Sequence, residues 1–296
     1  MNAQLARQAI ISRLSPQYGP GESAAIARIV LEDAFGVKGL GSDTFFTDAQ
    51  TKLLHSILDR LAKNEPVQYV LGQAQFFGLN FKVSPAVLIP RQETEELVAW
   101  VLEFLKDRDF SNPKVLDIGL GSGCIGITLK AKYKALQLFG LEKSKEALEV
   151  ATENATQLLG AGQFTFWEND VLIDENWKQL PDFEVIVSNP PYIPTHEIAL
   201  IPEHVRAHEP SLALFVDDDD PLIFYRNITA LAKSKLVSGG ALFFECNEFN
   251  APEVGQLLEQ NGFVGVEVKK DLMGKNRMVK GRVNASKFHR FFSISI

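Results

Sequence analysis

The spacing of hydrophobic residues changes once along the chain, near residue 72. Before that point, apolar residues recur at helical spacing in three stretches, residues 10–14, 24–35 and 53–61. Proline- and glycine-containing segments at residues 16–21 and 36–41 separate these stretches and predict breaks between helices. The pattern therefore predicts a small all-α domain over residues 1–72.

After residue 72 the pattern changes to short apolar runs that alternate with helical stretches. Residues 73–86 alternate around Gly78 and predict a β-hairpin linker, and residues 87–296 predict a second domain. Strands are expected at 114–118, 136–141, 163–167, 183–188, 240–246, 263–269 and 277–283, and helices at 97–107, 123–133, 144–158, 222–236 and 251–260. This alternation predicts an α/β fold, a doubly wound parallel sheet covered on both faces. The last two strands lie too close in sequence for a crossover helix, so a terminal antiparallel hairpin is expected.

The composition fits a two-domain protein in a reducing compartment. The 296 residues exceed the usual length of one domain, and 46% of them are hydrophobic, enough for a sizeable core. No apolar run reaches the length of a membrane span, and no hydrophobic leader opens the sequence. The two cysteines, Cys124 and Cys246, lack paired spacing and predict neither a disulfide framework nor a zinc site. We expect a cytoplasmic protein with no membrane partner and no metal.

The charge distribution argues against a protein that grips nucleic acid. The net charge is −7, and no block of lysine or arginine occurs anywhere in the chain. A protein that holds a duplex is expected to carry a basic face. The acidic run Asp217–Asp220 would repel phosphates near a site, although a solvated loop before the next helix is the simpler interpretation. No direct nucleic-acid partner is therefore expected.

The segment Asn189-Pro190-Pro191-Tyr192 carries the most specific chemistry. It follows an apolar run at 183–188 that reads as a buried parallel strand. Neither proline has a backbone N–H, so the carbonyls of Asn189 and Pro190 are left to accept hydrogen bonds beside the Asn189 side-chain oxygen. Such a site suits a planar –NH2 group, whose hydrogens the oxygens accept while Tyr192 packs on its face.

A second motif, residues 114–126, predicts a ligand site between a strand and a helix. Gly119, Gly121 and Gly123 allow the backbone to approach a ligand closely, and the following helix offers unpaired N–H groups. Asp117 precedes the loop and would repel a pyrophosphate but suit a cationic ligand such as S-adenosylmethionine. Two further acids end successive strands: Glu142, placed for ribose hydroxyls, and Asp170, placed for an adenine amino group.

These motifs together resemble the release-factor glutamine methyltransferases, the HemK/PrmC family. The resemblance extends over nearly the whole chain through residues 66–72, 88–98, 117–123, 189–193, 209–214 and 271–277. It implies a Class I (Rossmann-like) methyltransferase fold and methyl transfer from S-adenosylmethionine, which leaves S-adenosylhomocysteine. The implied substrate is the side-chain amide nitrogen (N5) of the glutamine in the Gly-Gly-Gln motif of class 1 peptide-chain release factors. The implied partner is then a release factor bound partly by the helical domain, and the enzyme is expected to be a monomer.

The resemblance and the motifs together assign the candidate site. The expected catalytic residues are Asn189, Pro190 and Tyr192; substrate binding is expected to involve these residues with Pro191 and Arg91. The expected cofactor-binding residues are Asp117, Ile118, Gly119, Leu120, Gly121, Glu142, Asp170, Val171 and Asn189. The sequence departs from the family pattern at Leu120, Gln92, Glu142 and residues 216–221.

Three alternatives remain open at this point. An adenine-N6 nucleic-acid methyltransferase would use the same pocket on a flipped base. A protein that binds the cofactor or a partner without catalysis is the second alternative. Arg91, Glu93 and Glu95 have either a substrate-orienting role or a structural role as ion-pair partners of one another.

Overall fold

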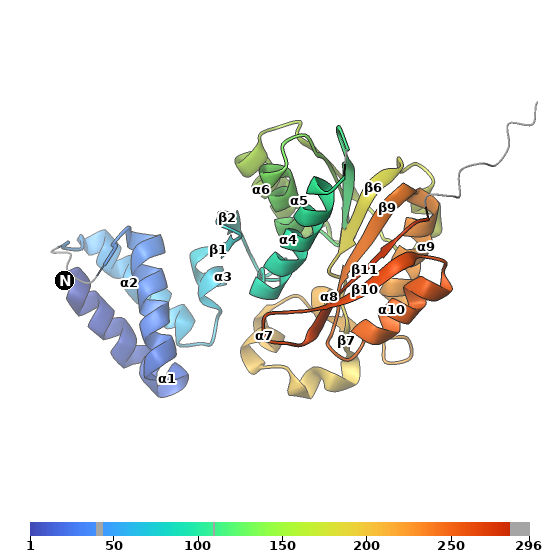
Figure 1. The fold of residues 1–296 in the computed structure, drawn as a ribbon. Helices are drawn as coiled ribbons and strands as arrows, with labels where there is room; N and C mark the ends of the chain where they lie inside the picture. Colours follow the sequence, from blue (N-terminus) through green and yellow to red (C-terminus); the bar gives the residue numbers. More distant parts are fainter. Residues whose placement is uncertain (40–43, 109, 285–296) are drawn as a thin grey trace, which may run out of the picture. The chain divides into compact units, whose positions relative to one another are not determined.

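The structure is a computed structural model that describes residues 1–39, 44–108 and 110–284 (Figure 1). The chain divides into two compact units. The first contains Met1–Gln73, Val83–Pro85 and Pro202–His208, and the second contains Ala74–Lys82, Ala86–Ile201 and the chain from Glu209 onward. The apolar tail at 288–296, for which we expect packing on the body, lies outside the described residues.

Helices α1 (Ala3–Phe35), α2 (Asp48–Leu61) and α3 (Val67–Leu71) form the first unit, together with α7 (Glu203–His208). The break expected over residues 16–21 is narrower than predicted. The helical turns continue on both sides of Gly19, whose φ of 76° and ψ of 165° kink the helix there. The N-terminus of α2 is fixed by a capping box, in which Thr47 and Gln50 satisfy each other's backbone N–H groups.

A seven-stranded sheet forms the centre of the second unit, with strand order β10-β11-β9-β6-β3-β4-β5. The strands are β3 (Lys114–Ile118), β4 (Gln137–Glu142), β5 (Phe164–Glu168), β6 (Phe183–Ser188), β9 (Leu236–Glu245), β10 (Val264–Lys270) and β11 (Asn276–Arg282). Strands β5, β4, β3, β6 and β9 pair in parallel, and β11 pairs antiparallel with both β9 and β10. The predicted parallel sheet with a terminal antiparallel hairpin is therefore confirmed.

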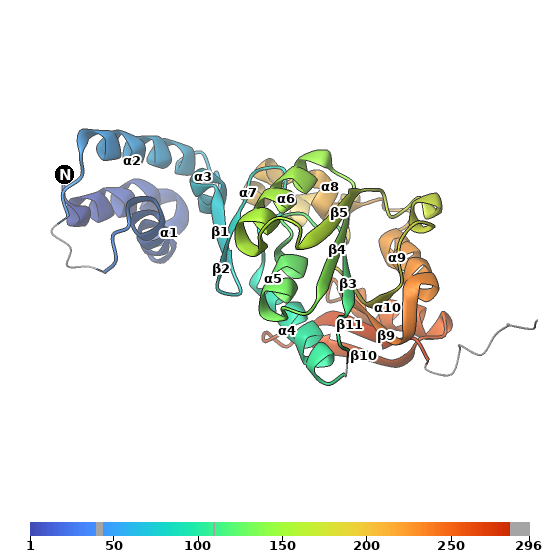
Figure 2. The same ribbon diagram turned by 90° about the horizontal axis from the view of Figure 1, so that it is seen from above.

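In the described part of the chain, five helices cover the two faces of this sheet. They are α4 (Gln92–Lys106), α5 (Cys124–Lys132), α6 (Lys145–Leu159), α9 (Ile223–Lys235) and α10 (Ala251–Gln260). Alternate residues of β3 separate the two layers. Val115 packs in the core shared with α4, α5 and α6, whereas Leu116 packs in the core shared with α9 and α10. Figure 2 shows α5 and α9 on opposite sides of the strands. The sheet is thus doubly wound, as predicted.

Shorter elements connect these parts. Strands β1 (Gln73–Phe76) and β2 (Leu79–Lys82) form a hairpin whose two turn residues, Phe77 and Gly78, both have positive φ. After β6 come η2 (Thr195–Leu200), α8 (Ser211–Leu214) and a small parallel pair of β7 (Ile193–Pro194) with β8 (Phe215–Val216); η1 (Asp174–Trp177) lies before β6.

The acidic run after β8 forms turns with partners of its own. Asp218 accepts a hydrogen bond from the backbone N–H of His196, and Asp220 pairs with Arg226. Within the described residues, no helix combines the length and the apolar character that a membrane crossing requires.

Candidate active site

A pocket opens at the carboxyl ends of β3, β4 and β6, where parallel strands place ligands in open α/β sheets. Most of the residues expected from the sequence line it. They are Arg91, Ile118, Gly119, Leu120, Gly121, Glu142, Asp170, Val171, Asn189, Pro190 and Pro191. Two expected residues, Asp117 and Tyr192, are not among the lining residues. The topology therefore brings the two motifs, which are far apart in sequence, to one pocket.

The glycine loop after β3 forms the floor of this pocket. Gly119, Gly121 and Gly123 have φ values of 75°, 52° and 78°, in the left-handed region that side chains rarely adopt. The loop folds back on β4, because the N–H groups of Gly119 and Leu120 both donate to the Leu141 carbonyl. Gly123 then caps α5, so the helix N-terminus faces the loop.

Leu120, the unusual residue of the loop, packs its side chain against β4. A Cβ placed on Gly140 would lie 2.6 Å from Leu120 Cδ2, so the leucine occupies space that only a glycine on β4 leaves open. Leu120 is buried, yet it contributes to the pocket lining. Gly140 on β4 thus leaves room for the Leu120 side chain, so the larger residue does not displace the loop backbone.

Asp117 lies beneath the loop and is almost completely buried. Its Oδ2 accepts the Gly126 N–H at 2.8 Å, which ties β3 to the first turn of α5. Its Oδ1 has no hydrogen-bond partner among the described residues. Burial raises the pKa of this carboxyl to about 8, and the negative charge of Glu142 adds to the shift. The carboxyl is therefore mostly protonated at neutral pH, and a cationic group bound nearby would favour its ionised form.

Gly126 should not tolerate a side chain, although alanine is the better helix former. A Cβ there would lie 2.7 Å from Leu138 Cδ1 and 3.0 Å from Asp117 Oδ2. We expect Gly126→Ala to lower the free energy of unfolding by about 1–3 kcal/mol. Gly21→Ala is the matched control, because a Cβ on this α1 residue meets nothing within 4 Å. Urea unfolding of both variants checks the difference, and equal stability of the two would contradict the packing argument.

Glu142 is the last residue of β4, and Asp170 lies just after β5. Both residues line the pocket. Glu142 is largely buried; its two oxygens accept the N–H groups of Gly121 and Ser144, each at 2.9 Å. Asp170 Oδ1 accepts the Leu172 N–H at 2.9 Å, and its Oδ2 pairs with Lys143 at 2.9 Å. Each carboxylate oxygen has more than one acceptor position, so these contacts orient the groups and leave capacity for ligand hydroxyls or amines.

The Asn-Pro-Pro-Tyr segment leaves the carboxyl end of β6 next to the glycine loop. The hydroxyl of the fully buried Ser188 donates to the Ile118 carbonyl at 2.7 Å and joins the ends of β6 and β3. Asn189, Pro190 and Pro191 line the pocket from there. The Tyr192 ring instead packs against the hydrophobic core shared with α9 and α10, and burial raises its pKa above its ordinary value.

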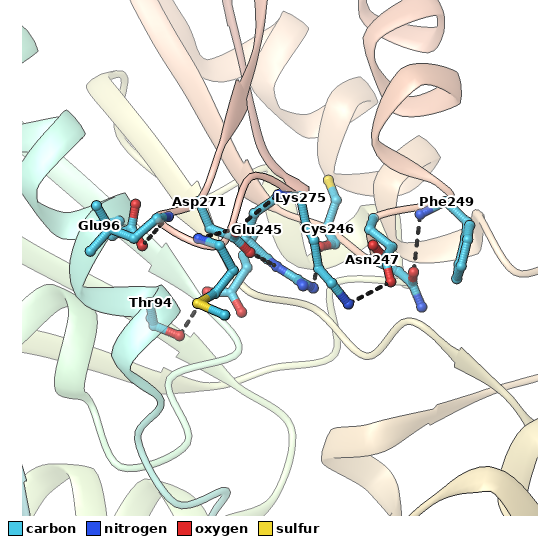
Figure 3. A network of polar contacts seen from close by, with 12 residues as sticks. Thr94, Glu96, Glu245, Cys246, Asn247, Phe249, Asp271 and Lys275 are labelled. Atoms are coloured by element: carbon cyan, nitrogen blue, oxygen red, sulfur yellow. Dashed lines mark hydrogen bonds and ion pairs between the residues drawn. The ribbon is translucent and has the colours of Figure 1, made fainter.

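The Asn189 side chain is oriented by two residues behind it (Figure 3 shows Thr94 and Glu245). Asn189 Nδ2 donates to Thr94 Oγ1 at 3.5 Å, and the Thr94 hydroxyl donates to Glu245 Oε2 at 2.7 Å. Glu245 itself also accepts from the Asn189 amide. Because the –NH2 end of Asn189 faces this pair, its Oδ1 is the end left for the pocket. Asn189 is thereby presented as a hydrogen-bond acceptor.

Glu245 is a buried carboxyl at the end of β9. Burial raises its pKa to about 7, against the opposing effects of the Thr94 hydrogen bond and the Arg277 charge. Glu93 repels the ionised form and adds to the rise. Among the described residues behind Asn189, Glu245 is therefore the group whose charge changes near neutral pH.

Arg91 has a structural partner that the sequence did not suggest. It pairs with Glu209, which is buried and also accepts the Ile89 N–H at 3.2 Å. Glu95 accepts the Phe77 N–H at 2.7 Å. The interpretation that Arg91, Glu93 and Glu95 pair with one another is thus wrong for Arg91 and Glu95. Arg91 still lines the pocket and keeps donors for a substrate.

Thr94 and Glu245 are the site residues that sequence reasoning missed. One signal was present, because Glu245 is another acid at the carboxyl end of an expected parallel strand, like Glu142. What the sequence lacked was the sheet order, which places β9 directly beside β6. Across residues 1–39, 44–108 and 110–284, no group of three or more histidine, cysteine or acidic side chains is arranged to hold a metal ion.

Comparisons with known proteins place these features in a family. Residues 94–205 match the model of the methyltransferase small domain, and residues 6–72 match the PrmC N-terminal domain. The release factor glutamine methyltransferase of Flavobacterium psychrophilum is 40% identical over 93% of this chain and 96% of its own length. The same-named protein of Bacteroides thetaiotaomicron is 39% identical over 88% and 93%. A methyltransferase structure from Pyrococcus furiosus, 16% identical, shares the fold, with a TM-score of 0.50 over 81% of this chain and all of that one.

Proposed function

Since the chain belongs to the family of release factor glutamine methyltransferases, we propose that it methylates class 1 peptide-chain release factors. The acceptor is the side-chain amide nitrogen of the glutamine in the Gly-Gly-Gln motif, and the methyl donor is S-adenosylmethionine. The relatives' names support methylation of a protein over the adenine alternative, which the same Asn-Pro-Pro-Tyr pocket left open.

The orientation of Asn189 is the observation that carries this proposal. An amide –NH2 group has two hydrogens to donate and a lone pair delocalised into its carbonyl. With its own –NH2 end held by Thr94 and Glu245, Asn189 offers Oδ1 to one of these hydrogens. The Pro190 carbonyl accepts the other. The two acceptors fix the plane of the substrate amide and direct one face of its nitrogen at the methyl donor.

The pocket residues fit S-adenosylmethionine, which supplies a methyl group on a positively charged sulfur. The loop from Ile118 to Gly121 brings its backbone to the ligand, and Glu142 and Asp170 supply acceptors for ribose hydroxyls and the adenine amine. Val171 lines the same part of the pocket and offers an apolar contact to the base. The unpartnered Oδ1 of Asp117 lies beneath the loop, and a cationic ligand bound above it would favour the ionised form of this carboxyl.

Catalysis by these residues consists of positioning and fixed dipoles. Asn189 is neutral and cannot remove a proton near pH 7. The substrate nitrogen loses its proton after it has gained the methyl group, when it is much more acidic. The prolines stiffen the loop that carries the acceptors. Tyr192 packs against the core in this structure, so stacking of its ring on the substrate amide requires a turn of the side chain. Release factors reach the site as folded proteins, and we assign the helical unit a role in holding them.

Tandem mass spectrometry of an intact class 1 release factor tests the proposal directly. The factor is incubated with the purified protein and S-adenosylmethionine, and its peptides are mapped for one added methyl group. We expect the label on the Gly-Gly-Gln glutamine, and none on a factor in which this glutamine is alanine. Methyl transfer to adenine in DNA or RNA, with an unlabelled factor, would overturn the proposal.

A further inference from the structure

Three large apolar side chains stand exposed at one edge of the second unit. Leu272 is 90% exposed and Met273 80%, both in the turn between β10 and β11. Phe249, 78% exposed, lies in the turn that follows β9. We refer to Phe249, Leu272 and Met273 as the edge patch. Large exposed apolar side chains on neighbouring turns mark an interaction surface more often than single scattered ones do.

The turn that carries Leu272 and Met273 is held rigidly from below. The buried Asp271 accepts the Met273 N–H at 3.0 Å and the Lys275 N–H at 2.9 Å through Oδ1. Its Oδ2 pairs with Arg277 at 3.1 Å, and these contacts lower the pKa of Asp271. The Leu272 N–H donates to Glu96 of α4 at 3.0 Å. Figure 3 shows Asp271, Glu96 and Lys275 in this network.

The turn that carries Phe249 is fixed in a similar way and joined to the first. Asn247 Oδ1 accepts the Phe249 N–H at 3.1 Å. Lys275 pairs with Glu248 at 3.0 Å and so connects the two turns (Figure 3 shows Lys275 and Asn247). Both backbones are therefore set before any partner arrives, which reduces the ordering cost of binding.

The residues that support the edge patch connect it to the network behind Asn189, where the acceptor amide is expected. Glu96, which holds Leu272, follows Thr94 by two residues on α4, and Thr94 contacts Asn189. Arg277, which holds Asp271, exerts its charge on Tyr192 and Glu245. Phe249 follows Glu245 by four residues. The residues that hold the edge patch in place are thus close in sequence to, or interact with, residues that contact the Asn-Pro-Pro-Tyr segment.

We infer that the edge patch docks the polypeptide around the methylated glutamine, an inference that rests on the proposed function. Two cations that support the turns are paired with carboxylates, Lys275 with Glu248 and Arg277 with Asp271. These pairings leave less positive charge at the turns for a phosphate backbone and suit an apolar protein segment. A few buried apolar anchors supply much of the affinity in protein interfaces. The rigid turns provide such anchors next to the reacting amide.

Steady-state kinetics with an intact class 1 release factor test the inference. We expect Leu272→Ser with Met273→Ser to raise KM for the factor about tenfold and to leave kcat within about twofold. Phe249→Ser should act in the same direction. Val264→Ser is the matched control, since Val264 is also exposed on β10 but lies at the other end of the strand. S-adenosylhomocysteine affinity, measured by calorimetry, should be equal in all four proteins and shows that the pocket is intact.

Each other outcome has a distinct meaning. An unchanged KM in both patch variants, with an active parent protein, overturns the docking inference alone. Loss of a dimer in the patch variants, seen by sedimentation, would assign the patch to a second copy of the chain and also overturns it. If the parent protein leaves the factor unmethylated, the proposed function fails, and the docking inference fails with it.

Discussion

Asn189→Ala should lower the rate of methyl transfer about a hundredfold to a thousandfold, the usual cost of losing a preset hydrogen-bond group at a reacting centre. The variant loses the acceptor for one hydrogen of the substrate amide, so the nitrogen is no longer held toward the methyl donor. Single-turnover rates with saturating release factor and S-adenosylmethionine measure this effect apart from substrate binding.

The fold should survive this change, because Asn189 lines the pocket and its contact with Thr94 is long, at 3.5 Å. The matched control is Asn261→Ala at the end of α10, where the side-chain amide donates to the Leu257 carbonyl of its own helix. We expect the control to keep the parent rate. Full activity in Asn189→Ala, or an equal loss in both variants, would remove Asn189 from the proposed mechanism.

The rate of methyl transfer should rise with pH, with a midpoint near the Glu245 pKa of about 7. The ionised carboxylate can only accept hydrogen bonds, so it draws both the Thr94 hydroxyl and the Asn189 amide toward itself. A protonated carboxyl can donate, and it then permits the Asn189 amide to turn its oxygen away from the pocket. Glu245→Gln resembles this second state at every pH, and we expect a rate about tenfold to a hundredfold lower, without the midpoint near 7.

The same substitution should have the opposite effect on stability. The ordinary pKa of a glutamate carboxyl is 4.5, and that of Glu245 in the folded protein is about 7, so the folded state holds its proton more tightly. The contribution of Glu245 to the free energy of unfolding is therefore highest below pH 4.5. It falls as the pH rises from 4.5 to about 7. Glu245→Gln removes that loss, and urea unfolding at about pH 8 should show a variant more stable than the parent protein.

Lower activity together with higher stability distinguishes a positioning residue from a structural one. Thr94→Val offers a second variant, because it keeps the shape of the side chain and removes the hydroxyl that links Asn189 to Glu245. We expect it to lower the rate as well. A pH midpoint near 7 that persists in Glu245→Gln would assign that ionisation to another group.

The bounds of helices and strands with a clear hydrophobic period were predictable from the sequence. Helices and strands with polar or glycine-rich ends were predicted too short. Strands β3 and β6 and helix α10 have the expected bounds. Helix α4 begins at Gln92 instead of residue 97, because its first turn is acidic and shows no apolar period. Strand β9 begins at Leu236 instead of residue 240, because Gly239 and Gly240 interrupt the apolar run.

The candidate site was predictable where one short segment carries all of its chemistry. The Asn-Pro-Pro-Tyr segment and the glycine loop contain their own donors, acceptors and turn residues, and both reach the same pocket. Thr94 and Glu245 depend on contacts across 151 residues of chain, which follow from the order of the strands. Asp117 shows the converse, since its strand-end position suggested direct contact with a ligand, whereas the structure places it beneath the loop.

The composition of the first unit has a consequence for synthesis on the ribosome. The segment Pro202–His208 belongs to this unit, although most of the unit ends at Gln73. A nascent chain can form α1 to α3 early, but α7 (Glu203–His208) emerges only after β3, β4, β5 and β6 have left the exit tunnel. The amino-terminal unit is therefore completed late, although vectorial synthesis normally lets the first domain fold first. We expect stalled chains that end before residue 202 to leave this unit more open to proteolysis than the full chain does.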